Sequence, residues 1–189
     1  MILHLIAIWL LTPPIPIHGQ GNFQDMDWDK AASEIRRLPA SAFPELPAVI
    51  RGDLDRRQCT IPQAYGYPRA HNVIRGSFTA KGQADWAVLC SQGGESTILV
   101  FKGGSIESVS QLAKGPDKNL LQVVGEGKIG YSRLISPVNG GSIVRYYREF
   151  GGPKPPPIDH EGIEDSFVGK ASVILFYYSG AWLRLTGAD

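Results

Sequence analysis

Short apolar segments separated by glycine and proline make up most of this chain from residue 72 onward. The sequence contains 22 Gly and 14 Pro, and both residue types interrupt long helices. The segments between them are rich in β-branched and aromatic residues, which fit the pleated surface of a sheet. This pattern predicts a protein that consists mainly of short strands joined by tight turns.

Eight segments have the length and composition of strands, and two of them are apolar throughout. Residues 98–101 and 173–176 show no alternation, which predicts central strands that are covered on both faces. Arg133 interrupts the segment 129–135, and Arg145 and Arg148 interrupt the segment 142–150. These arginines predict that each of the two strands has one solvated face. The eight predicted strands are 73–79, 85–90, 97–101, 120–124, 129–135, 142–150, 171–178 and 181–186.

Helices are predicted mainly near the N-terminus. A helical arm over 25–57 contains a first helix that stops at Pro39 and a second that starts near Pro44, where Leu46, Ile50 and Leu54 follow at four-residue spacing. A short internal helix is expected at 106–114. The predicted fold class is therefore mainly β (α+β): an antiparallel sheet or sandwich of about eight strands with two N-terminal helices and one short internal helix.

The first twenty residues have the features of a signal peptide. They are apolar from Ile2 to Leu11 and carry no charged side chain before Gly19. This apolar core is shorter than the roughly 20 residues that span a bilayer. We expect a cleaved signal at 1–20 and a single β-rich domain at 21–189, secreted or periplasmic and without a stable membrane span. An uncleaved anchor and a buried structural segment are the alternatives.

The chain contains two cysteines, Cys59 and Cys90. In an exported protein, an even pair favours one disulfide, which here would join the helical arm to the sheet. The alternatives are a reactive thiol with a basic partner such as His71, and two inert buried thiols.

The totals exclude several classes of protein. An apolar fraction of 43% and an aromatic fraction of 10% exclude general disorder. A net charge of +1 provides no field that would attract nucleic acid. Nucleotide-binding glycine loops and the nucleophile elbow of hydrolases are absent from the sequence.

The run from Gly76 to Val88 resembles one repeat of the FG-GAP/VCBS type, and residues 76–104 look like a strand, a turn and a further strand of such a repeat. The resemblance implies a propeller blade from an extracellular binding protein, with calcium held by the loop. Only Asp85 keeps an acidic ligand position here, because Ser77, Thr79 and Lys81 occupy the others. We therefore expect the strands without the metal.

The chain as a whole also resembles a family of short secreted bacterial proteins without an assigned activity. Three blocks carry this similarity: 59–63, 85–90 and 182–189. It implies export and no particular chemistry.

One candidate ligand-binding segment precedes the first predicted strand. It contains Tyr65, Tyr67, Arg69 and His71. Aromatic faces and a guanidinium can line a pocket for a sugar or a peptide. The alternative is a packed loop whose rings cover the edge of the core.

A second candidate is the polar cluster Asp159, His160 and Glu161, which follows a proline-rich connection at 151–157. These residues could bind a ligand or a cation, or His160 could act as a base. Consecutive side chains on an extended chain point to opposite faces, which favours the alternative of a solvated acidic loop.

From these observations we expect a non-enzymatic binding or interaction domain whose partner is an unknown protein or glycan, with no cofactor, metal or nucleic acid. The alternative is a small secreted hydrolase that uses His160 or His71 with a nearby carboxylate.

Overall fold

The computed structural model describes residues 26–125 and 127–188, so the predicted signal peptide at 1–20 lies outside the described residues. Three α-helices lie within these residues: α1 (Trp28–Ser33), α2 (Ala48–Arg56) and α3 (Gly140–Phe150). The strands of the N-terminal half are β1 (Arg37–Leu38), β2 (Ile61–Pro62), β3 (Val73–Gly76), β4 (Asp85–Gln92), β5 (Glu95–Phe101) and β6 (Val109–Pro116). Those of the C-terminal half are β7 (Leu121–Val123), β8 (Ile129–Tyr131), β9 (Arg133–Val138), β10 (Gly162–Phe167), β11 (Ala171–Tyr178) and β12 (Ala181–Thr186). Short 3-10 turns are η2 (Ala40–Ala42), η3 (Lys102–Gly104) and η4 (Asp117–Leu120).

Two four-stranded antiparallel sheets form the body of the protein. The first sheet has the order β3-β4-β5-β6 and the second sheet has the order β12-β11-β10-β9. The remaining strands form two small pairs, β1 with β2 and β7 with β8. The prediction of a mainly β, antiparallel protein is confirmed, although the described residues contain more strands than the expected eight.

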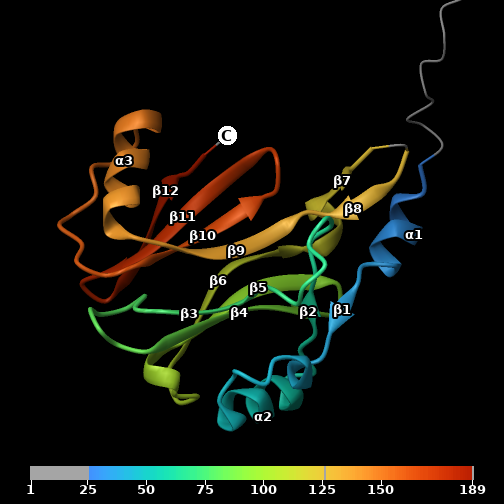
Figure 1. Ribbon diagram of the computed structural model, residues 1–189, viewed down its shortest axis with the longest axis horizontal. Helices are drawn as coiled ribbons and strands as arrows, with labels where there is room; N and C mark the ends of the chain where they lie inside the picture. The colour runs from blue at the N-terminus through green and yellow to red at the C-terminus, as the bar shows by residue number, and fades with distance from the viewer. Residues whose placement is uncertain (1–25, 126, 189) are drawn as a thin grey trace, which may run out of the picture.

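The sheets and helices are stacked in layers. Figure 1 shows α2 against one side of the first sheet and α3 against the far side of the second sheet. One apolar cluster joins α2 to the first sheet, a second lies between the two sheets, and a third joins the second sheet to α3. Both sheets therefore have an apolar cover on each face over much of their area.

Strands β4 and β5 contribute to two of these clusters by alternation. Val88 and Leu99 face α2, whereas Leu89 and Ile98 face the second sheet. Because successive side chains point to opposite faces, a strand between two apolar layers must be apolar at every position. The prediction of central strands with two covered faces is confirmed here, and also in β11, where Ile174 packs toward α3.

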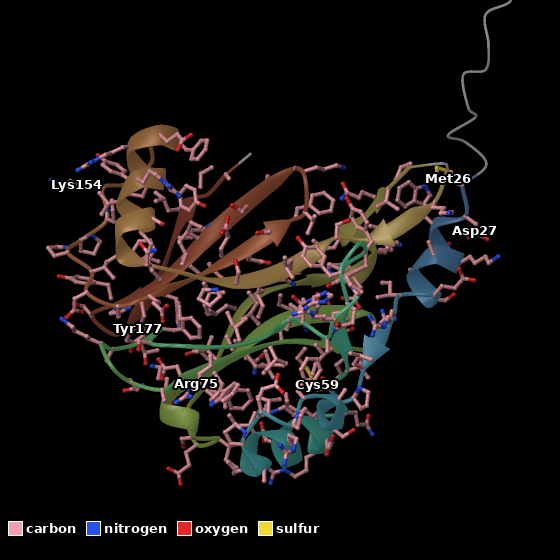
Figure 2. All side chains as sticks on the ribbon, viewed as in Figure 1. Met26, Asp27, Cys59, Arg75, Lys154 and Tyr177 are labelled. Carbon is pink, nitrogen blue, oxygen red and sulfur yellow. A yellow bond between two sulfur atoms is a disulfide. The ribbon has the colours of Figure 1, made fainter. Side chains whose placement is uncertain are left out.

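A disulfide joins Cys59, which follows α2, to Cys90 in β4, with their Cα atoms 5.4 Å apart. The bond lies between α2 and the first sheet (Figure 2). The prediction that a disulfide fastens the helical arm to the sheet is confirmed. The second helix begins at Ala48 rather than near Pro44, so Leu46 lies just before α2 and Ile50 and Leu54 lie within it. All three are buried in the same cluster, as their spacing predicts.

The internal helix predicted at 106–114 is wrong, because this segment contains β6, which pairs with β5 at the edge of the first sheet. Val109 and Leu112 are three residues apart, a spacing that fits one face of a helix. In the strand this odd spacing places them on opposite faces, so Val109 packs toward α2 and Leu112 toward the second sheet.

The strand predicted at 142–150 is also wrong, because residues 140–150 form α3. Asn139 caps this helix: its side chain accepts a hydrogen bond from the Ser142 N–H at 2.9 Å. Ile143 is fully buried against the second sheet. The β-branched and aromatic residues of this segment favour a strand. The helix forms instead because Asn139 caps it and the second sheet offers an apolar surface for it to pack against.

The polar cluster extends from Asp159 to Asp165. Residues 159–161 lie in a loop, whereas Gly162 to Asp165 belong to β10, an interior strand of the second sheet, so the expectation of a solvated acidic loop is wrong for this second part. The solvated face expected at Arg133 is likewise wrong. This side chain is 3% exposed and donates to the carboxylate of Asp165 in β10. A charged side chain in this position requires a buried partner, and the acidic segment provides it.

Asn72 joins the two sheets at their β3 and β9 edges. Its side-chain amide donates to Pro62 O at 2.7 Å and to Arg133 O at 3.1 Å, and its Oδ1 accepts from Ile135 N–H at 3.0 Å. The residue has a φ of 70°, a left-handed conformation that asparagine tolerates better than most residues. These bonds fix the end of the loop that leads into β3.

No helix within residues 26–125 and 127–188 combines the length and apolar character needed to cross a membrane.

Candidate functional site

The loop between β2 and β3 contains the first candidate segment, and its two ends are fastened together. The Gln63 amide donates to His71 O at 3.0 Å, and its Oε1 accepts from the His71 N–H, also at 3.0 Å. The same amide donates to Ile61 O at 3.0 Å. Gln63 is buried, so these bonds are shielded from water and hold the loop in one conformation.

His71 is a structural residue of this loop. Its Nε2 lies 2.6 Å from the Ala64 N, which can only donate, so Nε2 is the acceptor. The proton must then be on Nδ1, which donates to Arg69 O at 2.9 Å. Burial lowers the pKa of His71, and the positive charge of Arg36 adds to this, although the bond to Arg69 O acts in the opposite direction. Because both ring nitrogens bind backbone atoms, His71 is not arranged as a base.

Tyr67 projects from the middle of this fastened loop. Its ring packs against the His71 ring with the centroids 5.3 Å apart, yet 41% of the residue is exposed. The preceding Gly66 has a φ of 76°, a conformation that glycine adopts without strain. The loop therefore presents an aromatic ring to solvent on a rigid support.

Tyr65 anchors the same loop to the β7–β8 pair. Its N–H donates to Tyr131 O at 2.7 Å, and its hydroxyl accepts from the Gln122 amide at 3.3 Å. The loop approaches β8 so closely that a Cβ on Gly130 would lie 2.8 Å from the Tyr65 Cβ. Tyr131 itself is buried, which raises its pKa well above the usual range.

Tyr67 separates two hollows in the surface. The first, which we call the sheet hollow, has a volume of about 310 Å³ and lies over β9–β11, where Tyr67, Leu134, Glu164, Ser166 and Lys170 are among its walls. The second, the central hollow, has a volume of about 350 Å³. Its walls include Tyr65, Tyr67, Glu34, Arg36 and Ile129.

A third depression, the helix hollow, continues from the central hollow along α1. It has a volume of about 430 Å³ and shares Ala31, Glu34 and Ile129 with the central hollow. Met26 and Asp27, at the start of α1, also line it, and Figure 2 shows them beside the β7–β8 pair. The sheet and central hollows are thus neighbours across Tyr67, and the central and helix hollows are neighbours across Ala31, Glu34 and Ile129. We call these three adjacent hollows the row.

Only some of the four residues predicted to bind a ligand in the β2–β3 loop line this row. Tyr65 and Tyr67 line it, whereas His71 supports it from within the loop. Arg69 is exposed and contributes its carbonyl oxygen to His71, but it lines none of the three hollows.

The second predicted set lies elsewhere. Asp159, His160 and Glu161 line a separate depression of about 360 Å³ together with Lys81. The Glu161 carboxylate accepts from the Ser77 N–H at 2.8 Å, and the His160 Nδ1 donates to the carbonyl oxygen of Glu161 at 2.9 Å. This depression shares no residue with the row beside Tyr67.

The loop that resembles an FG-GAP repeat is closed by hydrogen bonds around Asp85. This buried carboxylate accepts from the Thr79 N–H at 2.7 Å, the Thr79 hydroxyl at 2.8 Å, the Gln83 amide at 2.6 Å and the Gly103 N–H at 2.7 Å. Protein donors therefore occupy its lone pairs. Within the described part of the chain, no group of three or more histidine, cysteine, aspartate or glutamate side chains is placed to hold a metal ion.

Several walls of the row could not be identified from the sequence. Glu34 comes from the end of α1, Glu164 from β10, and Lys170 from the turn between β10 and β11. Each is an ordinary polar residue in its local sequence. Only the packing of α1 and the second sheet around the Tyr67 loop brings them together, so no local signal marks them.

Comparison of the chain with models of known protein families, with curated protein sequences and with solved structures found no match.

Proposed function

We propose that this protein is an exported, non-enzymatic binding domain whose binding site is the row of hollows beside Tyr67. Export is supported by the apolar segment at 1–20 and by the Cys59–Cys90 disulfide, since such bonds persist in oxidising compartments. The FG-GAP-like segment at 76–104 agrees with this class, because such repeats are typical of extracellular binding proteins.

The observation that carries the proposal is the position of Tyr67. Its exposed ring forms a wall of two hollows at once. The loop behind it is fastened by Gln63 and His71, so the ring is held in place before any ligand arrives. A site that is ordered beforehand loses less conformational entropy on binding, which favours affinity.

The geometry supports catalysis less well. A histidine that acts as a base needs a ring nitrogen within reach of the substrate, and both nitrogens of His71 bind backbone atoms. In the other cluster, the Glu161 carboxylate is engaged by the backbone of Ser77. The hydrolase alternative therefore lacks a supporting arrangement at His71. At His160, the ring is bonded to the carbonyl oxygen of Glu161 and not to its carboxylate.

Binding is tested by probing the protein recovered from the exporting cells against arrays of oligosaccharides and of peptides. Tyr67→Ala is compared with Tyr178→Ala, a control residue that is equally exposed at 40% and lies outside the row. We expect at least one class of compound to bind the wild type and the Tyr178 variant but not the Tyr67 variant. Equal binding by all three proteins, or binding by none, contradicts the proposal.

Export is tested by cell fractionation. We expect the protein outside the cytosol, shortened by about 20 residues at its N-terminus, and with no free thiol in non-reducing mass spectrometry. Recovery from the cytosol with intact residues 1–20 and two reduced cysteines would exclude the exported form.

A further inference from the structure

We propose that the ligand of this row is an extended, uncharged oligosaccharide that places successive sugar units in the sheet, central and helix hollows. This inference rests on the proposed function above and specifies the class of ligand.

The first argument is the shape of the row. Each hollow has a volume of about 310 to 430 Å³, at the lower end of the range for small-molecule sites. Tyr67 joins the first two, and Ala31, Glu34 and Ile129 join the last two. A linear ligand with repeated units of similar size fits a row of similar hollows, whereas a single compact molecule would leave most of the row empty.

The second argument is charge balance. The sheet hollow contains Glu164 and Lys170, and the central hollow contains Glu34 and Arg36. The helix hollow also has both signs, with Asp27 and Glu34 among its acidic residues and Lys30 and Lys128 among its basic residues. No hollow presents a field of one sign, so the row has no preference for a polyanion or a polycation. An uncharged polymer fits this pattern.

The third argument is the mixture of groups on the walls. On the face of the second sheet that points away from the first sheet, Ser166 in β10 lies between its cross-strand partners Leu134 in β9 and Ser172 in β11. The Ser172 hydroxyl donates to the Glu164 carboxylate at 2.8 Å. Sugar rings have apolar C–H faces and a rim of hydroxyls that both donate and accept. A flat aromatic ring such as Tyr67 fits the faces, and carboxylate and hydroxyl groups fit the rim.

An extended peptide fits the sheet hollow less well. Extended peptides usually bind by adding a strand to an unpaired sheet edge. The sheet hollow lies instead on the face of the second sheet, and two of its strands, β10 and β11, are interior. In the central hollow, the Tyr65 N–H is already bonded to Tyr131 O. The walls therefore offer side chains rather than a row of free backbone groups.

The test is isothermal titration of the exported protein with uncharged oligosaccharides of one to five units, in β-1,4-glucose, α-1,4-glucose and β-1,4-N-acetylglucosamine series. For at least one series we expect affinity to rise with each unit up to about three and then to level off. Tyr67→Ala should weaken binding of the longer oligomers by about tenfold or more, while Tyr178→Ala should not change it.

A second variant locates the ligand along the row. Ser166→Trp should fill the sheet hollow, so that affinity levels off one unit earlier than in the wild type. Ser110→Trp, on β6 and outside the row, is the matched control and should leave the length dependence unchanged. Circular dichroism checks that each variant is folded.

The outcomes separate this inference from the proposed function. Binding that depends on Tyr67 but is confined to peptides would overturn the oligosaccharide and keep the binding domain. Oligosaccharide binding that ignores chain length, or that is unchanged in Tyr67→Ala, would also overturn the inference. If neither class of compound binds in a Tyr67-dependent way, both proposals fail.

Discussion

The guanidinium of Arg133 and the carboxylate of Asp165 form a bidentate ion pair. Both residues belong to the second sheet. Nε lies 2.8 Å from Oδ1, and Nη2 lies 2.8 Å from Oδ2. The remaining N–H groups of Arg133 donate to Ser96 and to Ala113 O, so all five donors have partners. One side chain thereby joins β9 and β10 of the second sheet to β5 and β6 of the first.

Replacing Arg133 should therefore destabilise the whole sandwich. In Arg133→Met, the Asp165 carboxylate, whose side chain is 14% exposed, loses its cation, and we expect the free energy of unfolding to fall by about 3 to 5 kcal/mol. Urea denaturation followed by tryptophan fluorescence measures this change. The double variant Arg133→Met, Asp165→Leu should recover much of the loss, because it leaves no unpaired charge. Equal losses in the single and double variants would contradict the role of the ion pair.

Loss of the disulfide should weaken the attachment of α2. The bond joins cysteines 31 residues apart, and closing a loop of this length stabilises a protein by about 3 to 4 kcal/mol in the chain-entropy model. Cys59→Ala combined with Cys90→Ala should lower the denaturation midpoint accordingly. Hydrogen exchange should increase first in α2, while β10 and β11 stay protected. A midpoint that is unchanged by these substitutions, or by a reductant in the wild type, would argue against this contribution.

The imidazole of His71 should make stability depend on pH. Burial lowers the pKa of His71 below its usual 6.5, and the unfolded chain keeps the usual value. Between the two values the unfolded state binds more protons. The contribution of His71 to stability is therefore complete above pH 6.5 and is lost as pH falls from there toward the lower pKa of the folded state.

Comparison of His71→Phe with the wild type tests this dependence. The phenylalanine keeps a ring beside Tyr67 but cannot titrate, so the unfolding free energy of the variant should change less between pH 7.5 and pH 5 than that of the wild type. Resonances of residues 63–71 in NMR spectra of the wild type should shift over the same interval. An identical pH profile in the two proteins would show that His71 does not control it.

A methyl group on Gly130 should displace the Tyr65 loop. An added Cβ would lie 2.8 Å from the Tyr65 Cβ and 2.9 Å from Val124 Cγ1. We expect Gly130→Ala to cost about 1 to 3 kcal/mol, as overpacked sites do. Gly115→Ala, on the edge strand β6, is the matched control, because no atom lies within 4 Å of its added Cβ. Urea denaturation of both variants measures the difference, and equal losses would contradict the close approach.

Much of the architecture could be predicted from local sequence. The hairpin between β11 and β12 has its turn at Ser179 and Gly180, both with positive φ, and the dipeptide predicts such a turn. The apolar runs at 98–101 and 173–176 predict strands with two covered faces, because every position of such a strand meets an apolar layer. The cysteine pair predicts a disulfide when its even count is combined with the expected export of the chain.

Residues 106–114 and 140–150 show the limit of such patterns. The first segment has helical spacing but forms β6, because β5 offers it a partner edge. The second is rich in strand-forming residues but forms α3, because an apolar surface on the second sheet is available for Ile143. Local preferences are worth less than about 1 kcal/mol per residue, so tertiary packing can reverse them.

Local features of the chain predict β-sheets, the turn at Ser179 and Gly180 and, in an exported protein, the disulfide, because they depend on neighbouring residues or on the number of cysteines. The packing of the whole molecule places Arg133 against Asp165 in the interior and Tyr67 between two hollows, with Glu34 and Glu164 on either side. These side chains come from segments far apart in the chain, and their positions follow from how two sheets and a short helix pack together. No local sequence pattern predicts which of these side chains meet, because residues that pack together can be far apart in the chain.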